Sequence, residues 1–437
     1  MLEVIGFSLL SLLWEIWNNP PKQQVQLESI AWHNTAIFEL PKTEPDPVVR
    51  DIVDDYLNNL SQQGINSDRQ GVWLQSDWIE LADRNGKIPV AAASLTKIAT
   101  TLASIGKLGV DRLFLTKIYH TGTIEDGILK GDLIVEGDRD PFFVWEEAIA
   151  LSNTLNRLGV REIRGNVLVD DEFYMNYQTD PEITGKLLKQ GLDSSSWSSE
   201  VKQQFRTLPL TTPRPQLSIL GEVEVIKNVP PTARLLVLHR SLPLVDILRQ
   251  MNIYSNNKMA QMLADIVGGA SAVADYGRKV TGVSPSEIQL INGSGLGEAN
   301  RISPRAATKM LIEIERLLQP SGLEVTDIFP VASRDRVGTM QDRSLPQGIA
   351  IKTGTLDRVS ALAGVIPVSE DRRVWFAVIN NGWQIKQFRQ QQDELLQELS
   401  NYWHLEPLGR SCSACFNRSQ SLGIYLGDPD RNQIITY

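Results

Sequence analysis

Several residue types that often carry enzyme chemistry are scarce in this chain. Its 437 residues include only 2 cysteines and 4 histidines. The two cysteines, Cys412 and Cys415, form a single C-x-x-C near the C-terminus, with His404 as the one histidine nearby. A structural zinc site needs four ligands, so this pair favours a tail feature or a local disulfide over a metal or redox centre.

An excess of positive charge is also missing. The formal net charge is −9 and the isoelectric point is about 5.2, and no basic patch stands out in the sequence. These properties argue against a nucleic-acid partner. The hydrophobic content of 42% and the charged content of 22% are those of an ordinary globular protein. The length allows two or three domains with a large core.

The N-terminal segment, residues 1–18, lacks the features of a standard export signal. Its first basic residue is Lys22, and no A-x-A cleavage site follows. Its apolar run is interrupted at Glu15, which makes it shorter than the roughly 20 residues of a membrane span. The segment is equally consistent with an uncleaved anchor, an interfacial helix or an atypical signal.

The spacing of apolar residues predicts a discontinuous domain around an insertion. We expect a linker over 19–47, a catalytic domain over 48–111 and 238–403, an inserted β-rich domain over 112–237 and a C-terminal tail over 404–437. Helices are predicted over 46–61, 91–106, 244–270, 304–318 and 384–402, and Gly106 is expected to end the second. A hairpin over 70–84 and strands over 348–355, 359–368 and 372–380 have short connections, which favours antiparallel pairing.

Lys97 is the one ionisable residue in the segment AAASLTKIATTLASIG, residues 91–106. Leu95, Ile98 and Leu102 recur at helical spacing, and so few charges predict a helix that is buried nearly all round. A buried lysine without a partner tends to lose its proton. Ser94 lies three residues earlier, on the same face of the helix. A neutral amine in that position would act as a base toward the hydroxyl group.

Two further motifs accompany Ser94-x-x-Lys97. Ser255-Asn256-Asn257 lies in mid-chain, and a K-T-G-T segment, residues 352–355, lies on a predicted strand. The order S-x-x-K, S-x-N, K-T-G is the signature of serine β-lactamases and penicillin-binding proteins. Each motif is common by chance, but the ordered set in matching structural contexts is not. Asn256 stands where the signature has Asp, which matters little if only the outer residues reach the site.

Each motif residue has a predicted role. Ser94 would attack a carbonyl group and form an acyl-enzyme, with Lys97 as its base. Ser255 would pass the proton to the leaving amine, and Asn257 would hold Lys97 and the substrate amide. The oxyanion would lie between backbone N–H groups of the nucleophile and of the K-T-G-T strand. On that strand, Lys352 would supply a positive charge for a substrate carboxylate, and the hydroxyl groups of Thr353 and Thr355 would hydrogen-bond it. Gly354 would let the substrate backbone approach closely.

With these motifs the chain resembles the class C, low-molecular-mass penicillin-binding proteins, of the penicillin-binding-protein-4 type. Residues 291–304, INGSGLGEANRISP, are similar to that family's GSGLS segment. Residues 137–143, GDRDPFF, and 164–174, RGNVLVDDEFY, resemble segments of its inserted region. The likeness covers residues 48–403, although the insertion is short for the family. By the same resemblance Asp140 is a candidate contact for the stem peptide, with a turn carboxylate beside a proline as the other interpretation.

The resemblance implies an α+β fold: a transpeptidase-like domain with an antiparallel sheet and helices, interrupted by the insertion. It implies a serine D-Ala-D-Ala carboxypeptidase or endopeptidase that acts on peptidoglycan stem peptides or cross-links and is inhibited covalently by β-lactams. It implies no metal and no cofactor. Such substrates lie outside the cytoplasmic membrane, so we expect a periplasmic or cell-envelope location, with the N-terminal segment serving export or membrane-surface association.

Three alternatives remain open from the residues alone. Tyr254-Ser255-Asn256 also reads as Y-x-N, which some β-lactamases and esterases use. A class A β-lactamase needs a glutamate base in an E-x-x-x-N arrangement, and the spacing from Glu287 to Asn292 is one residue too long. A non-catalytic penicillin-binding sensor would show decay of a catalytic position, and none has decayed.

Overall fold

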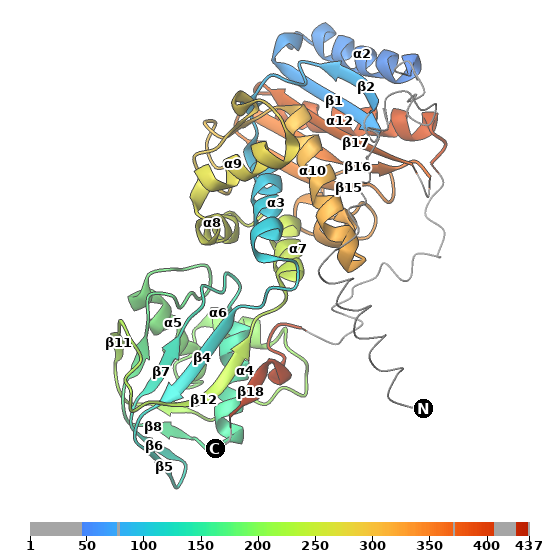
Figure 1. Ribbon diagram of the computed structural model, residues 1–437. Helices are drawn as coiled ribbons and strands as arrows, with labels where there is room; N and C mark the ends of the chain where they lie inside the picture. Colours follow the sequence, from blue (N-terminus) through green and yellow to red (C-terminus); the bar gives the residue numbers. More distant parts are fainter. Residues whose placement is uncertain (1–45, 77–78, 370–371, 406–424, 436–437) are drawn as a thin grey trace, which may run out of the picture. The chain divides into compact units, whose positions relative to one another are not determined.

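The computed structural model describes residues 46–76, 79–369, 372–405 and 425–435 (Figure 1). The predictions for the N-terminal segment, for nearly all of the linker and for the two cysteines lie outside these residues. Within the described ranges no helix combines the length and the apolar character that a membrane crossing requires.

A five-stranded antiparallel sheet joins the two segments, 48–111 and 238–403, that we expect to form one domain. Its order is β15-β16-β17-β1-β2, and β1 pairs with β17 along its whole length. The predicted hairpin and the three consecutive strands are confirmed. The bounds of the five strands are β1 Gln70–Ser76, β2 Ile79–Arg84, β15 Ala350–Leu356, β16 Val359–Pro367 and β17 Arg373–Asn381. The K-T-G-T strand, β15, therefore lies at one edge of the sheet.

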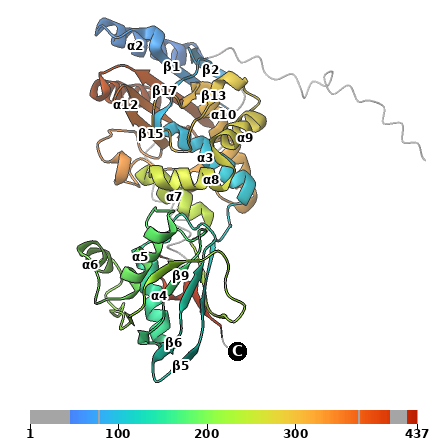
Figure 2. The same ribbon diagram turned by 90° about the vertical axis from the view of Figure 1, so that its left-hand side faces the viewer.

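Helices cover both faces of this sheet, so its central strands are buried on both sides. Alternate residues of a strand point to opposite faces. On β17, Phe376 and Val378 pack with helices α2 (Pro47–Gln62) and α12 (Ile385–Tyr402), whereas Trp375 and Ala377 pack with the core on the α10 side. Helix α10 (Pro304–Leu318) matches its predicted range exactly and crosses β17, β1 and β16 (Figure 1, Figure 2).

The Ser94 segment forms a short 3₁₀ turn, η4 (Ala93–Leu95), which leads into helix α3 (Thr96–Leu108). The prediction that Gly106 ends this helix is wrong. The helix ends instead at Gly109, which has a φ of 82°. Gly106 is needed for packing, because a Cβ atom there would overlap the hydroxyl group of Tyr276 on helix α9 (Gly269–Thr281).

The single helix predicted over 244–270 is divided into α7 (Leu244–Tyr254), α8 (Asn257–Ile266) and the start of α9. The first break is at Ser255, whose φ of 52° is in the left-handed region. Residues other than glycine rarely adopt that conformation. The apolar spacing continues across the break, so periodicity alone could not reveal it.

The inserted module contains three helices that the sequence analysis did not predict. It assigned only a β-rich character to residues 112–237. Instead, α5 (Pro181–Leu192) and α6 (Ser199–Phe205) begin there, each capped by a polar side chain, Asp180 and Ser198 respectively. The third is α4 (Trp145–Arg157).

Two small mixed sheets complete the module, in the orders β11-β9-β7-β4-β12-β18 and β10-β8-β6-β5. Parallel pairs such as β7 with β9 occur in both. The strand bounds are β4 Leu115–His120, β5 Thr123–Glu125, β6 Ile128–Lys130, β7 Leu133–Glu136, β8 Glu162–Ile163, β9 Val167–Val169, β10 Ser218–Ile219, β11 Val223–Val225, β12 Arg234–Arg240 and β18 Asn432–Ile434.

The end of the chain is part of this module and not a separate tail. Strand β18 pairs antiparallel with β12. Next to it, Arg431 donates to the carboxylate of Glu147 on α4, and His239 Nδ1 lies 2.8 Å from Asn432 Oδ1. Arg431 and Glu147 have side-chain exposures of 8% and 1%. A buried carboxylate of this kind depends on its cation.

We expect Arg431→Ala to lower the free energy of unfolding by about 3–5 kcal/mol, because it leaves Glu147 buried without its partner. The control is Arg240→Ala, which removes an exposed hydrogen bond to Gln433 in the same strand pair and should cost under about 0.5 kcal/mol. Urea unfolding of both variants measures the difference. Equal midpoints would show that the C-terminal strand is not held by this ion pair.

Candidate active site

The amine of Lys97 lies at the centre of the motif residues. Its Nζ atom is 3.0 Å from Ser94 Oγ, 2.7 Å from Asn257 Oδ1 and 2.7 Å from the carbonyl oxygen of Ser294. The Lys97 side chain is fully buried, and it forms no ion pair with a carboxylate of the described residues. The predicted proximity of the nucleophile and its base is therefore confirmed.

The three neighbours of Lys97 differ in what they can do. The oxygens of Asn257 and Ser294 can only accept hydrogen bonds, whereas the Ser94 hydroxyl can also donate. Burial lowers the pKa of Lys97 to about 7. In the neutral amine, two N–H groups donate to the two acceptors and the lone pair faces Ser94. This geometry is compatible with the predicted role of Lys97 as a base for the Ser94 hydroxyl group.

A second buried lysine contacts the middle motif. Lys352 Nζ lies 3.0 Å from Ser255 Oγ and 2.8 Å from the backbone oxygen of Thr353. Burial, and to a lesser extent the charge of Lys97, hold the pKa of Lys352 well below its ordinary value. Ser255 thereby connects the K-T-G-T strand to the site, as the order of the motifs predicts.

The structure decides which register of the middle motif faces the nucleophile. Ser255 lines a cavity of about 270 Å³ together with Ser94, whereas Tyr254 is 58% exposed and lines other cavities. The side chain of Asn256 accepts from the backbone N–H groups of Lys258 and Met259 and caps α8. The Y-x-N alternative therefore has no support, and Asn256 caps α8 and hydrogen-bonds Tyr177 outside the Ser94 cavity.

The loop over residues 292–295 belongs to the site, although the sequence analysis gave it no role there. Besides the Ser294 carbonyl group, it contributes Gly295, which has a φ of 84° and whose added Cβ would overlap the Ala93 oxygen. Asn292 Oδ1 accepts from the backbone of Ser294 and Gly295 and fixes the loop. The signal was present in the sequence as N-G-S-G, a typical tight-turn composition.

The glycine in the K-T-G-T motif has a packing role that the sequence analysis did not predict. An added Cβ at Gly354 would lie 3.0 Å from the backbone oxygen of Ala92 and 3.0 Å from the backbone nitrogen of Ser94. The glycine therefore lets β15 pack directly on the turn that carries the nucleophile. The predicted role of Gly354 in the close approach of a substrate backbone stays a prediction.

The remaining predicted residues divide into two groups. Thr353 and Thr355 line the cavity with Ser94. Asp140 does not line it: this carboxylate is buried in the inserted module, where it accepts from the backbone N–H of Phe142. Burial raises the pKa of Asp140 to about 7. Its contact with a stem peptide stays a prediction.

Five cavity residues were missed by the sequence analysis. Gly338 and Thr339 come from a 3₁₀ turn, η7 (Gly338–Met340), and Asp342 and Arg343 follow it. Arg389, from helix α12, completes the rim. None of these residues belongs to a motif, so only the fold could bring them to the nucleophile.

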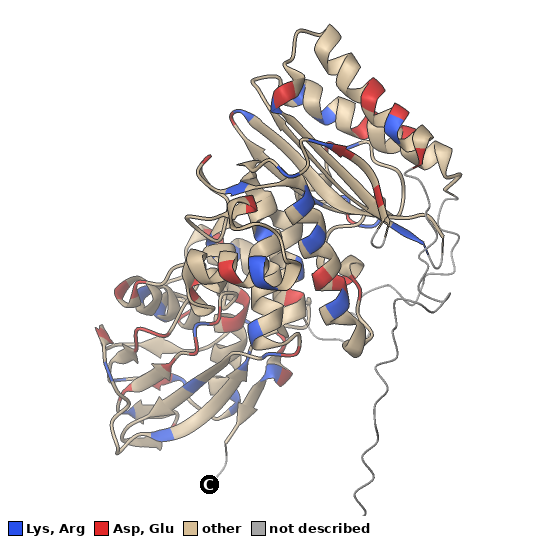
Figure 3. Ribbon diagram, turned by 45° about the horizontal axis from the view of Figure 1, so that its top comes forward, with Lys and Arg blue, Asp and Glu red and all other residues tan. Residues whose placement is uncertain are grey.

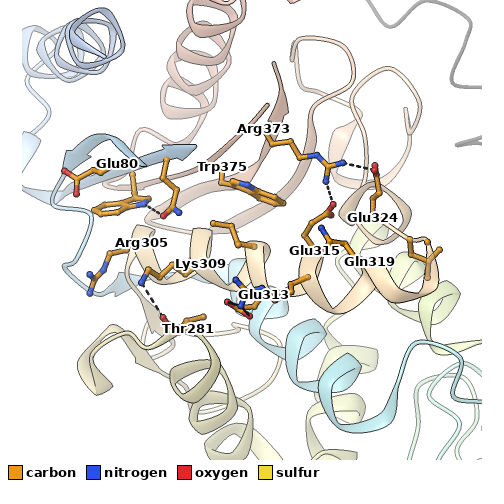
Figure 4. Close-up of a pocket in the computed structure, with 16 residues that line it drawn as sticks. Glu80, Thr281, Arg305, Lys309, Glu313, Glu315, Gln319, Glu324, Arg373 and Trp375 are labelled. Carbon is orange, nitrogen blue, oxygen red and sulfur yellow. Dashed lines mark hydrogen bonds and ion pairs between the residues drawn. The ribbon is translucent and has the colours of Figure 1, made fainter. Parts of the chain in front are cut away.

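A larger cavity, of about 880 Å³, lies elsewhere, between α10 and the strands β1, β2 and β17 (Figure 4). No motif residue lines it. Its charged side chains largely neutralise one another, as where Arg373 pairs with Glu315 and Glu324. Figure 3 shows the same mixing of acidic and basic residues over the ribbon as a whole.

Comparison with known families identifies the chain from its sequence. The model of the D-Ala-D-Ala carboxypeptidase 3 (S13) family matches residues 56–192 and 216–402. The chain belongs to this family. The matched ranges include all three motifs and most of the inserted module, and the family's activity agrees with the resemblance noted from the motifs.

Two curated relatives of this S13 protein carry matching names. The carboxypeptidase DacB of Mycolicibacterium smegmatis is 26% identical over 343 residues, which is 69% of this chain and 74% of the relative. The D-alanyl-D-alanine carboxypeptidase DacB of Haemophilus influenzae is 23% identical over 404 residues, covering 69% and 83% of the two chains.

Solved structures show that the S13 fold is shared. The predatory endopeptidase Bd3459 of Bdellovibrio bacteriovorus, solved with an immunity protein, superposes with a TM-score of 0.65 at 21% identity, over 78% of this chain and 94% of that chain. Penicillin binding protein 4 of Haemophilus influenzae gives a TM-score of 0.58 at 19% identity, over 79% and 99%. The predicted α+β fold is confirmed.

The packing of the 292–295 loop against the nucleophile turn can be tested with two glycines. Gly295→Ala and Gly297→Ala both place a side chain at positive φ, but only the first meets the Ser94 turn, because nothing lies near an added Cβ at Gly297. We expect Gly297→Ala to cost about 1–2 kcal/mol of stability. Gly295→Ala should cost roughly 1–3 kcal/mol more and slow acylation by benzylpenicillin roughly 100-fold, through displacement of Ser94.

Urea unfolding and stopped-flow acylation measure these two quantities. If the two variants have the same free energy of unfolding and the same acylation rate constant, the claim that the loop supports Ser94 is refuted.

Proposed function

We propose that this S13 peptidase hydrolyses the D-Ala-D-Ala bond of peptidoglycan stem peptides, or D-Ala cross-links, with Ser94 as the nucleophile. The observation that carries the proposal is the position of the buried Lys97 amine, 3.0 Å from Ser94 Oγ and without a carboxylate partner in the described part of the chain. A hydroxyl group with a nearby base is the usual arrangement for acyl transfer.

In the first half of the reaction, Ser94 Oγ bonds to the carbonyl carbon of the penultimate D-alanine, and its proton passes to Lys97 Nζ. The oxyanion so formed would be stabilised by the backbone N–H groups of Ser94 and Thr355. The close packing of β15 on the Ser94 turn supports this assignment. Collapse of the intermediate breaks the C–N bond and leaves an acyl-enzyme.

The departing amine would take its proton from the Ser255 hydroxyl group, which is reprotonated with the proton that Lys97 took from Ser94, so that Lys97 is neutral again. The Ser255 hydroxyl group lines the same cavity as Ser94 and is hydrogen-bonded to Lys352. The amine leaves as D-alanine, or as the second stem peptide when a cross-link is cut. Water then attacks the acyl-enzyme, passes a proton to Lys97, and Ser94 leaves as a hydroxyl group by the reverse of the first step.

We assign recognition of the substrate to residues that lie around the Ser94 cavity. Asn257 would hold the substrate amide as well as Lys97, and Thr353 and Thr355 would hydrogen-bond the terminal carboxylate, near the positive charge of Lys352. β15 is the edge strand of its sheet, and although its first residues are bonded to Pro330 and Val331, the residues after Ile351 would offer outer backbone groups to an extended peptide. The stem-peptide role of Asp140 remains part of this proposal.

The names of structural neighbours support the substrate class and the inhibitors. One is titled a predatory peptidoglycan endopeptidase, another is the same enzyme acylated by penicillin G, and a third is penicillin binding protein 4 complexed with a β-lactam. We infer that this chain also acts on the cell wall and is acylated by β-lactams. A location in the cell envelope follows from that substrate, and the N-terminal segment would serve export or membrane-surface association.

The β-lactamase alternative would need a carboxylate for deacylation. Glu287, the residue considered for that role, is bonded to Ser303 and Arg305 and does not line the Ser94 cavity. The non-catalytic sensor alternative would need an incomplete site, and the motif side chains are hydrogen-bonded as a working site requires.

The test uses a monomeric pentapeptide muropeptide and a cross-linked muropeptide. The protein should release D-alanine from the first or cut the second, and Ser94→Ala should abolish both activities. Benzylpenicillin should add to the tryptic peptide that contains Ser94, as measured by mass spectrometry. The control, Ser199→Ala on the exposed start of α6, should behave as wild type. An adduct on another residue, or hydrolysis by Ser94→Ala, would overturn the proposal.

A further inference from the structure

Two guanidinium groups line the cavity of Ser94, and they differ in their partners. Arg343 is almost buried, with a side-chain exposure of 4%, and it is paired with Asp393. Arg389, on helix α12, forms no ion pair with any described residue. Its Nη2 atom instead donates to Thr355 Oγ1 at 2.9 Å. Arg389 is thus a cation that lines the cavity and that no carboxylate of the described residues neutralises.

Lys352, the cation of the K-T-G-T motif, does not line the Ser94 cavity as Arg389 does. Lys352 is fully buried, and its Nζ atom is hydrogen-bonded to Ser255 and to the backbone of Thr353. Burial also holds its pKa low. Lys352 is therefore not among the residues that line the cavity, whereas Arg389 is. A carboxylate between the two threonine hydroxyl groups would meet the guanidinium first.

The chemistry of Arg389 suits a carboxylate. A guanidinium group has five N–H donors in a planar fork that matches two carboxylate oxygens. The bond to Thr355 uses one donor and still lets the threonine hydroxyl donate its own hydrogen to a ligand. The one carboxylate that lines the cavity, Asp342, is exposed and forms no ion pair with Arg389, so the fork is not already occupied by it.

We propose that Arg389, together with Thr353 and Thr355, binds the C-terminal carboxylate of the substrate and determines specificity for it. This inference rests on the proposed function, which it deepens by naming the residue that selects the substrate. The preferred peptides are those in which the residue after the scissile bond carries a free carboxylate. Peptides that end in an amide at that residue are disfavoured.

The test compares substrates that differ only in this carboxylate. The first pair is benzylpenicillin and its methyl ester, read out as the rate constant of acylation. The second pair is an N-acylated L-Lys-D-Ala-D-Ala peptide and its C-terminal amide, read out as kcat and KM. The variants are Arg389→Gln, which removes the charge, Arg389→Lys, which retains it without the fork, and Lys386→Gln as a matched control on an exposed position of α12.

Arg389→Gln should lower kcat/KM for the two carboxylate substrates by roughly 10- to 150-fold, the value of one charge-assisted hydrogen bond. Most of the loss should appear in KM for the peptide. The acylation rate constant for the methyl ester and kcat/KM for the peptide amide should change by less than about twofold, because these substrates have no carboxylate for the guanidinium group to bind. Arg389→Lys should recover part of the loss, and Lys386→Gln should match wild type.

Two outcomes would overturn this inference. An equal loss on both members of a pair would mean that Arg389 acts by holding Thr355 and β15, which is a structural role. No loss on either member would mean that the guanidinium does not reach the substrate. Failure of the proposed function gives a different result, since wild type would then neither hydrolyse the peptide nor be acylated by either penicillin.

Discussion

The structure depends on one constraint: a lysine amine is held inside the protein, and none of the described carboxylates is paired with it. Lys97 is fully buried, and the groups around it are a hydroxyl, an amide oxygen and a backbone oxygen. A charged ammonium ion is costly in such a place, so the pKa of Lys97 falls to about 7. In the proposed mechanism, this lowered pKa is what makes Lys97 a base at neutral pH.

Much of the surrounding fold serves to keep that arrangement. Ser255 interrupts an otherwise continuous helical pattern in a left-handed conformation, and the interruption brings Asn257 to the amine. Gly295 and Gly354 allow a loop and a strand to pack on the nucleophile turn from two sides.

The sequence predicted the parts whose signals are local. Helix α10 matches because Ser303 caps its start, proline occupies its first turn and its apolar spacing is regular. The motif residues Ser94, Lys97 and Ser255 were found because their types and order are specific. The helices of the inserted module were missed because a polar, serine-rich stretch resembles a loop. Arg389 and the Ser294 carbonyl group were missed because only tertiary packing brings them to the site.

The most direct test of the central claim is the pH dependence of Ser94 acylation by benzylpenicillin. Only the neutral amine of Lys97 has a lone pair, so its active fraction rises with pH and levels off above the pKa. The account predicts a rate constant that increases about tenfold per pH unit below pH 7 and is constant from about pH 8 to 9. A rate that keeps rising toward pH 10 would show that Lys97 retains its proton and would contradict the account.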